Sequence, residues 1–189
     1  MLKLKQIAVA FLFNDNQKVL FLHKKSTSTF LPGLLVPIGG HIEGEEIEDP
    51  NKACLREIEE ETGLLVNHID SLTLRYVVLR MKDKNEIRIQ YVYFGNVMSE
   101  SELIESDEGQ LSWIESKDIS QQNVTATTRE IIKHYFVEGI GTDQVYVGSM
   151  KSFKGEPLIT WAVLEDWEFP VITCSREKNA LLKASNKES

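Results

Sequence analysis

Residues 40–64 read GHIEGEEIEDPNKACLREIEEETGL and decide the fold. The second half of this stretch predicts a helix over residues 50–62. Asp49 is a favourable N-cap, Pro50 suits the first helical position, and Gly63 suits the residue just past the end. Three glutamates on this helix fall at positions i, i+3 and i+4, so their carboxylates share one face within about 100° of arc. They are Glu57, Glu60 and Glu61.

Three like charges on one helical face need an explanation, because each such pair costs about 0.2–0.5 kcal/mol on an isolated helix. A bound cation removes that cost. Carboxylate oxygens suit hard ions such as magnesium, which commonly joins one or two carboxylates to substrate phosphates. The alternative interpretation is an acidic helix face exposed to water, and the residues around the helix decide between the two.

The whole stretch resembles the Nudix box. The family pattern is a glycine, five residues, a glutamate, seven residues, then Arg-Glu-aliphatic-x-Glu-Glu-x-Gly-aliphatic. From Glu48 to Leu64 every fixed position is satisfied, with a capped helix where the family has one. Seven residues instead of five separate Gly40 from Glu48, which we interpret as a two-residue bulge in the loop before the helix. Residues 1–140 are similar to MutT-type members of the family.

The resemblance implies an α+β or α/β fold, with a mixed β-sheet sandwiched between helices and extra C-terminal strands. The sequence itself predicts a hairpin within residues 7–22, a second hairpin within residues 72–97, and a second helix that begins near a capping box at Thr127 and ends before Gly139. The predicted strands are 7–13, 19–22, 72–81, 87–97, 111–114, 144–147, 158–164 and 169–173.

Three parts are expected along the chain. They are a Nudix hydrolase domain at 1–140, a β-rich extension at 141–175 and a polar tail at 176–189. Strand edges left exposed by the extension favour self-association. A homodimer is therefore expected.

The resemblance implies Mg²⁺-dependent hydrolysis of a nucleoside diphosphate linked to another group. For a MutT-type chain we expect a nucleoside triphosphate pyrophosphohydrolase that releases a monophosphate and pyrophosphate, with oxidised purine nucleotides among its substrates. Hydrolysis of ADP-ribose or another such diphosphate stays open. So do a nucleotide-sensing regulatory module without turnover and an isomerase of allylic diphosphates. The expected partner is a small-molecule nucleotide.

The resemblance also assigns roles to residues. The implied ligands of Mg²⁺ or Mn²⁺ are Gly40 through its carbonyl, Glu57, Glu60, Glu61 and, outside the box, Glu108. The implied catalytic group is Glu57, Arg56 and Glu60, in which Glu57 orients or deprotonates the attacking water. By the same analogy, Arg56 and Glu48 form an ion pair that holds the loop to the helix.

Substrate recognition is less specific in the sequence. Lys24, Arg88 and His41 are our candidates for phosphate binding, and Lys25 and Arg80 are further available cations. Each alone is more commonly a surface charge. Aromatic rings that could stack on a base are more commonly core residues in strand-rich segments; these are Phe30, Tyr76 and Trp113. The asparagine that MutT-type members use for oxidised guanine has no clear counterpart, although Asn123 is near in sequence.

Composition excludes several other classes. The 189 residues carry 29 acidic against 21 basic side chains, a formal charge of -8, so binding to a nucleic-acid polymer is not expected. No stretch approaches the roughly 20 apolar residues of a membrane span, and no cleavage site follows the apolar run 7–13, so we expect no membrane association and a cytoplasmic location. Cys54 and Cys174 are interpreted as free thiols, and the histidines lack zinc-site spacing.

Overall fold

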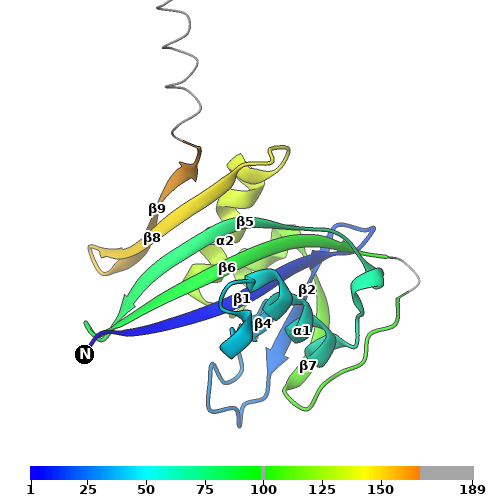
Figure 1. Ribbon diagram of the computed structural model, residues 1–189. Helices are drawn as coiled ribbons and strands as arrows, with labels where there is room; N and C mark the ends of the chain where they lie inside the picture. The colour runs from blue at the N-terminus through cyan, green and yellow to red at the C-terminus, as the bar shows by residue number, and fades with distance from the viewer. Residues whose placement is uncertain (99–100, 167–189) are drawn as a thin grey trace, which may run out of the picture.

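The computed structural model describes residues 1–98 and 101–166. Within them, nine strands form one mixed sheet in the order β3-β2-β1-β6-β5-β8-β9, with β4 paired to β1 and β7 paired to β2 (Figure 1). The strands are β1 Lys3–Phe13, β2 Lys18–Lys24, β3 Leu35–Val36, β4 Ile38–His41, β5 Ile69–Lys82, β6 Glu86–Val97, β7 Gly109–Glu115, β8 Val145–Phe153 and β9 Glu156–Leu164. The helices are α1 Pro50–Thr62 and α2 Ala126–His134, with 3₁₀ turns η1 Gly44–Glu46, η2 Val66–His68 and η3 Ser116–Gln121 and a π-helical turn η4 Tyr135–Gly139.

One helix covers each face of the sheet, so the protein has two apolar cores (Figure 1). On one face Ile58 of α1 packs in a cluster with Ala10, and on the other Ile131 of α2 packs in a cluster with Phe11. Successive residues of β1 alternate between these cores, as side chains of a strand must. Burial on both faces explains why this strand is a continuous apolar run in the sequence. The predicted α+β sandwich is confirmed.

Strand β1 changes neighbours along its length, and this change positions the site. Phe13 pairs with Val19 of β2, whereas Ala8 pairs with Gly40 of β4. The predicted hairpin within residues 7–22 is therefore confirmed, but its strands are paired only close to the turn. β4 takes the place beside the first half of β1 and brings its glycines next to α1.

Helix α1 has the predicted bounds and the predicted caps. The Asp49 side chain accepts a hydrogen bond from the backbone N–H of Lys52, with Oδ1–N 3.3 Å. Gly63 ends the helix in the left-handed region at φ 72°, where glycine is favoured because it lacks a Cβ. Cys54, on the apolar side of this helix, is a buried free thiol as predicted.

The second hairpin and the second helix are also confirmed, with different ends. β5 and β6 extend beyond the predicted strands, and β6 runs parallel to β1. The second helix closes in the π-helical turn η4 instead of a regular α-helical turn. The carbonyl of Gly139 in this turn accepts a hydrogen bond from the buried guanidinium of Arg75, with O–Nη2 2.7 Å.

Two strands of the predicted C-terminal extension continue the same sheet. β8 pairs parallel with β5, and β9 pairs antiparallel with β8. These strands confirm the predictions at 144–147 and 158–164. The predicted strand at 169–173, Cys174 and the tail at 176–189 lie outside the described residues. None of the helices in the described ranges is both long and apolar enough to cross a membrane.

Candidate active site

A cleft of about 1040 Å³ lies where β4, α1 and the loop after β2 meet. Glu57 and Glu61 of α1 line it together with Glu108, which immediately precedes β7. β7 pairs with β2 so that Gly109 lies opposite Lys24, and this register brings Glu108 beside the end of β2. Residues far apart in sequence thus form one acidic wall.

Arg56 pairs with Glu46, so the predicted ion pair with Glu48 is wrong. Its guanidinium contacts both carboxylate oxygens of Glu46, with Nε–Oε1 2.8 Å and Nη2–Oε2 3.1 Å. Nη2 also donates to the carbonyl oxygen of His41 at 3.0 Å. Glu46 is buried at the end of η1, whereas Glu48 is exposed. The Arg56 hydrogen bonds lower the pKa of Glu46 to about 2.

This pair also corrects the position of the two extra residues. Five residues separate Gly40 from Glu46, as the family pattern requires, and nine instead of seven separate Glu46 from Arg56. The extra residues therefore lie in the turn between η1 and the N-cap Asp49, not in a bulge after Gly40. Gly40 consequently satisfies the pattern.

The acidic side chains of the site are held in two pairs, each bridged by a cationic side chain. Nη1 of Arg56 donates to Glu57 Oε1 at 2.9 Å and to Glu60 Oε2 at 3.0 Å. Nζ of Lys24 lies 3.5 Å from Glu61 Oε1 and also contacts Glu108 Oε2. Both bridges lie where carboxylates would otherwise repel one another.

Glu60 differs from the other predicted ligands. Glu57, Glu61, Glu108 and Gly40 all line the cleft, but Glu60 does not, and its side chain is 58% exposed. The structure therefore brings together four of the five predicted ligands. Glu60 is linked to Glu57 through the Arg56 guanidinium, which contacts both carboxylates.

Burial raises the pKa of two of these carboxyl groups. The pKa of Glu61 rises to about 7, because its desolvation outweighs the hydrogen bond from the Gly39 N–H at 2.9 Å and the charge of Lys24. Burial likewise raises the pKa of Glu57, against the lowering effect of Arg56. Neighbouring carboxylates, among them Glu108, add to both shifts. Carboxylates of this kind favour a nearby positive charge.

Two adjacent glycines are required for different reasons. A Cβ on Gly40 would lie 2.5 Å from both carboxylate oxygens of Glu57, so the side chain of Glu57 can occupy this place only beside a glycine. Gly39 has φ 141°, and a Cβ there would overlap the backbone carbonyl of Ala8. Gly40 therefore makes room for the site, and Gly39 makes room for the β4–β1 pairing.

The predicted phosphate-binding residues all line the cleft, namely Lys24, His41 and Arg88, as do Lys25 and Arg80. Of the predicted aromatic residues, only Phe30 lines it, since Tyr76 is fully buried in the α2-side core and Trp113 packs against the α1-side core. Asn123 is not among the lining residues and donates to the carbonyl of Gly33 at 3.2 Å.

Two residues of the site, Glu46 and Lys5, were not predicted from the sequence. Glu46 is the first: the spacing after Gly40 indicates Glu46, whereas the spacing before Arg56 indicates Glu48, and only one of the two can pair with Arg56. Lys5 lines the cleft and lies opposite Arg88 across the parallel β1–β6 pairing. The alternation of β1 places Lys5 on the face of Val9, but only the strand order shows which residues lie beside it.

The donor set suits a hard divalent cation in its chemistry, since it offers carboxylate oxygens and a backbone carbonyl. As the side chains stand, however, no three acidic, histidine or cysteine side chains of the described ranges converge on one ion position. Lys24 and Arg56 instead supply positive charge to the carboxylates. The Lys24 ammonium therefore supplies the positive charge between Glu61 and Glu108.

Comparison with protein families identifies the chain. Residues 3–135 match the family model described as NUDIX domain. This match covers more than half of the chain, so the chain belongs to the NUDIX family and is a Nudix hydrolase. β8 and β9 lie beyond the matched residues. Among proteins of curated function, none matches this sequence.

Solved structures share the fold. The MutT protein from Methanosarcina mazei Go1 is 20% identical with a TM-score of 0.62, over 74% of this chain and 97% of that chain. A MutT protein from Bacillus halodurans is 21% identical with a TM-score of 0.57, over 84% and 97%. An Ap4A hydrolase from C. elegans is 15% identical with a TM-score of 0.60, over 73% and 99%. Identities this low show the fold alone.

Proposed function

We propose that the protein hydrolyses a nucleoside diphosphate linked to another group, in a reaction that depends on Mg²⁺ or Mn²⁺. The observation that carries the proposal is that Glu57, Glu61 and Glu108 line one cleft together with Gly40. These residues would hold the cation, with the Gly40 carbonyl as a further ligand. Glu60 would act beside them, by holding Arg56 against Glu57.

The charge of the site supports this assignment. A pyrophosphate is strongly negative, and the acidic wall would repel it. When bound, a divalent cation supplies the positive charge that reverses this repulsion and makes the attacking water more acidic. Lys24 would have to release Glu61 and Glu108 if they are to hold the cation, and its ammonium would then be available to phosphate oxygens. His41, exposed at the end of β4, is the second phosphate contact that we assign.

Glu57 has the properties of a general base. Its carboxyl group is partly buried in the cleft, and burial raises its pKa, so the carboxylate accepts a proton more readily than an exposed one. Nη1 of Arg56 holds Oε1 at 2.9 Å and leaves Oε2 for the water. Arg56 is in turn fixed by Glu46 and by the carbonyl of His41.

Within this class we propose a nucleoside triphosphate pyrophosphohydrolase that releases a monophosphate and pyrophosphate. The cleft volume of about 1040 Å³ is sufficient for a nucleotide. Membership of the NUDIX family supports the reaction class, and two of the structurally similar proteins are called MutT and one an Ap4A hydrolase. ADP-ribose and dinucleoside polyphosphates are the competing substrates.

A panel assay tests this proposal. Wild-type protein is incubated with nucleoside triphosphates, oxidised purine triphosphates, ADP-ribose and diadenosine tetraphosphate, each with Mg²⁺, with Mn²⁺ and with chelator, and the products are separated by ion-exchange chromatography. We expect cleavage of a diphosphate bond with either metal and none with chelator. Tight nucleotide binding without any product would instead support a regulatory module.

A further inference from the structure

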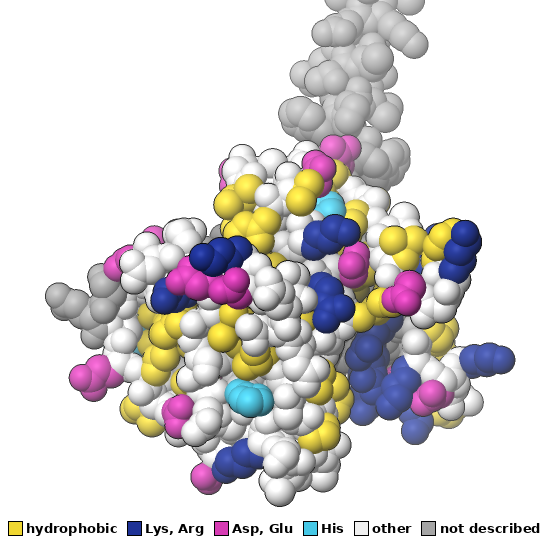
Figure 2. Space-filling view, turned by 180° about the vertical axis from the view of Figure 1, so that it is seen from behind, with side chains coloured by type: hydrophobic (Ala, Val, Ile, Leu, Met, Phe, Trp, Pro, Cys, Tyr) yellow, Lys and Arg dark blue, Asp and Glu magenta, His cyan; other side chains and the backbone are white. Residues whose placement is uncertain are grey.

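A row of basic side chains crosses the sheet at the end of the cleft. Lys5 of β1 lies directly opposite Arg88 of β6, and Arg88 lies directly opposite Arg80 of β5. Neighbouring strands are about 4.8 Å apart, so the row spans about 10 Å. Lys82 follows on the same face of β5, and all four side chains line the cleft. Figure 2 shows Lys and Arg side chains gathered over this end of the molecule.

One acidic side chain offsets only part of the positive charge of this row. Like charges directly opposite on neighbouring strands are destabilising. Within the described residues, one acidic side chain, Glu86, lies among the four cations. It pairs with Arg88, with Nε–Oε1 2.6 Å, and lies directly opposite Lys82. In the described part of the chain, the charged groups of Lys5, Arg80 and Lys82 have no hydrogen-bond or ion-pair partner. Burial and the charge of Arg88 lower the pKa of Arg80, and the charge of Glu86 acts against them.

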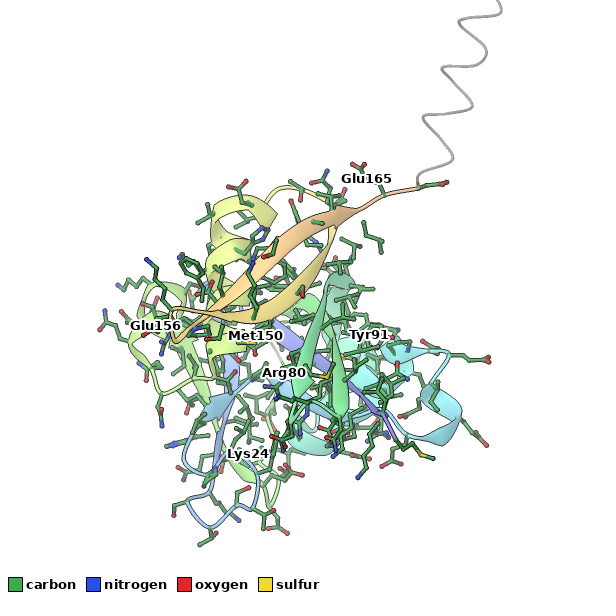
Figure 3. All side chains as sticks on the ribbon, turned by 90° about the vertical axis from the view of Figure 1, so that its left-hand side faces the viewer. Lys24, Arg80, Tyr91, Met150, Glu156 and Glu165 are labelled. Atoms are coloured by element: carbon green, nitrogen blue, oxygen red, sulfur yellow. The ribbon has the colours of Figure 1, made fainter. Side chains whose placement is uncertain are left out.

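The row belongs to the same cleft as the acidic wall but lies at a distance from it. Along β1, Lys5 is two residues from Ile7, which pairs with His41 of the site. Two strand residues span roughly 7 Å. Figure 3 shows Arg80 on β5 and Lys24 on β2 on the same side of the molecule. The cleft therefore has an acidic end for a cation and a basic end beyond it.

The basic end does not suit an uncharged nucleobase. Phe30 is the one aromatic residue among the described lining residues, and it is 51% exposed on the loop after β2. Gln90, two residues from Arg88 along β6, is a polar side chain that lines the same cleft. Guanidinium groups present fixed pairs of N–H donors that match phosphate oxygens. The chemistry of this end is that of a phosphate site.

We infer that the substrate carries a second phosphate, separate from the diphosphate that is cleaved, and that Lys5, Arg80 and Arg88 bind it. This inference rests on the proposed function and narrows its substrate class. The second phosphate is either a phosphomonoester on the linked group or a continuation of a polyphosphate chain. Both present the same anion to the row.

Matched substrate pairs test the inference. NADH and NADPH differ only by a phosphomonoester, and diadenosine diphosphate and diadenosine tetraphosphate differ only in chain length. We expect wild-type kcat/KM to be at least about tenfold higher for the more phosphorylated member of one pair. The less phosphorylated member lacks the phosphate that would accept charged hydrogen bonds from the row, and such bonds are strong enough to give this ratio. The pair that shows the preference identifies the source of the phosphate.

Charge-removing variants localise the effect. In Lys5→Gln and in Arg80→Gln/Arg88→Gln the preference should fall toward one, through a higher KM for the more phosphorylated substrate and not through kcat. Arg129→Gln, on the exposed face of α2, is the matched control. Lys5 is exposed, so its variant remains folded if the double variant does not. Equal rates within both pairs, or a preference that survives these changes, would overturn the inference and leave hydrolysis intact.

A binding measurement separates this result from failure of the proposed function. If wild-type protein cleaves nothing, calorimetry with the same substrate pairs and Ca²⁺ still measures whether the basic row binds the additional phosphate. We expect about tenfold tighter binding of the phosphorylated member, lost in Lys5→Gln. Equal dissociation constants would overturn the inference directly.

Discussion

Nε and Nη2 of Arg56 donate to the two carboxylate oxygens of Glu46, at 2.8 and 3.1 Å. This pair joins η1 to the middle of α1 and fixes the guanidinium that also contacts Glu57. The loop before the helix and the proposed general base are therefore held by one side chain. Its partner on the loop is the fixed glutamate of the family pattern, with five residues between it and Gly40.

Glu46→Gln should destabilise the protein, because it removes the charge of a buried carboxylate that accepts three hydrogen bonds, two from Arg56 and one from the Glu43 N–H. We expect the free energy of unfolding in urea to fall by about 1–3 kcal/mol. Glu48→Gln is the matched control and should stay within about 0.5 kcal/mol of wild type, since Glu48 is exposed. A larger loss of unfolding free energy in Glu48→Gln than in Glu46→Gln would indicate that Arg56 pairs with Glu48 instead.

The stabilisation by Glu46 should depend on pH. Its pKa is about 2 in the folded protein and about 4.3 in an unfolded chain. A lowered folded pKa gives stability that is fully present above the unfolded pKa and is lost as the pH falls through the folded pKa. The difference in unfolding free energy between wild type and Glu46→Gln should therefore shrink between about pH 5 and pH 2. A difference that stays constant over this range would contradict the assignment.

The two glycines of β4 should respond differently to alanine. Gly40→Ala displaces only the flexible end of Glu57, so we expect a protein of near-normal melting temperature whose turnover is reduced about 10²-fold. Gly39→Ala meets the backbone of Ala8 at a φ that favours glycine, and should cost about 3 kcal/mol or more of stability. Thermal melts and kinetics on both variants check this. Normal turnover with a large loss of stability in Gly40→Ala would show that Gly40 does not make room for Glu57.

Lys24 and a divalent cation should compete for Glu61 and Glu108. In Lys24→Met the two carboxylates lose their ammonium, so the rise in melting temperature on adding millimolar Mg²⁺ should exceed that of wild type. Lys25→Met, which removes a neighbouring charge without a salt bridge to these carboxylates, should behave like wild type. A smaller Mg²⁺ effect in Lys24→Met would show that the lysine assists cation binding instead of opposing it.

The sequence predicted α1 and its glutamates because every signal for them is local. The N-cap Asp49 and the left-handed Gly63 need no distant partner. The choice between Glu46 and Glu48 was different, since glutamates stand at both positions and an insertion can be placed on either side of them. Only the direction of the carboxylates toward Arg56 distinguishes the two.

Contacts between distant strands lay beyond the sequence. Lys5 and Arg88 are neighbours because β1 and β6 pair in parallel, and no spacing in the chain encodes that pairing. The meeting of Lys24 with Glu108 depends in the same way on the β2–β7 register. Glu108, which the resemblance implies as a ligand, lines the cleft, whereas Glu60 is exposed outside it.

The most direct test of the account is the turnover of Glu57→Gln with Mg²⁺ on the best substrate of the panel. Glu59→Gln, exposed on the same helix and outside the cleft, is the matched control. We predict a fall in kcat of about 10²–10⁴-fold for Glu57→Gln, with little change in substrate affinity, and wild-type turnover for Glu59→Gln. Normal turnover in Glu57→Gln, or an equal loss in both variants, would contradict the proposed mechanism.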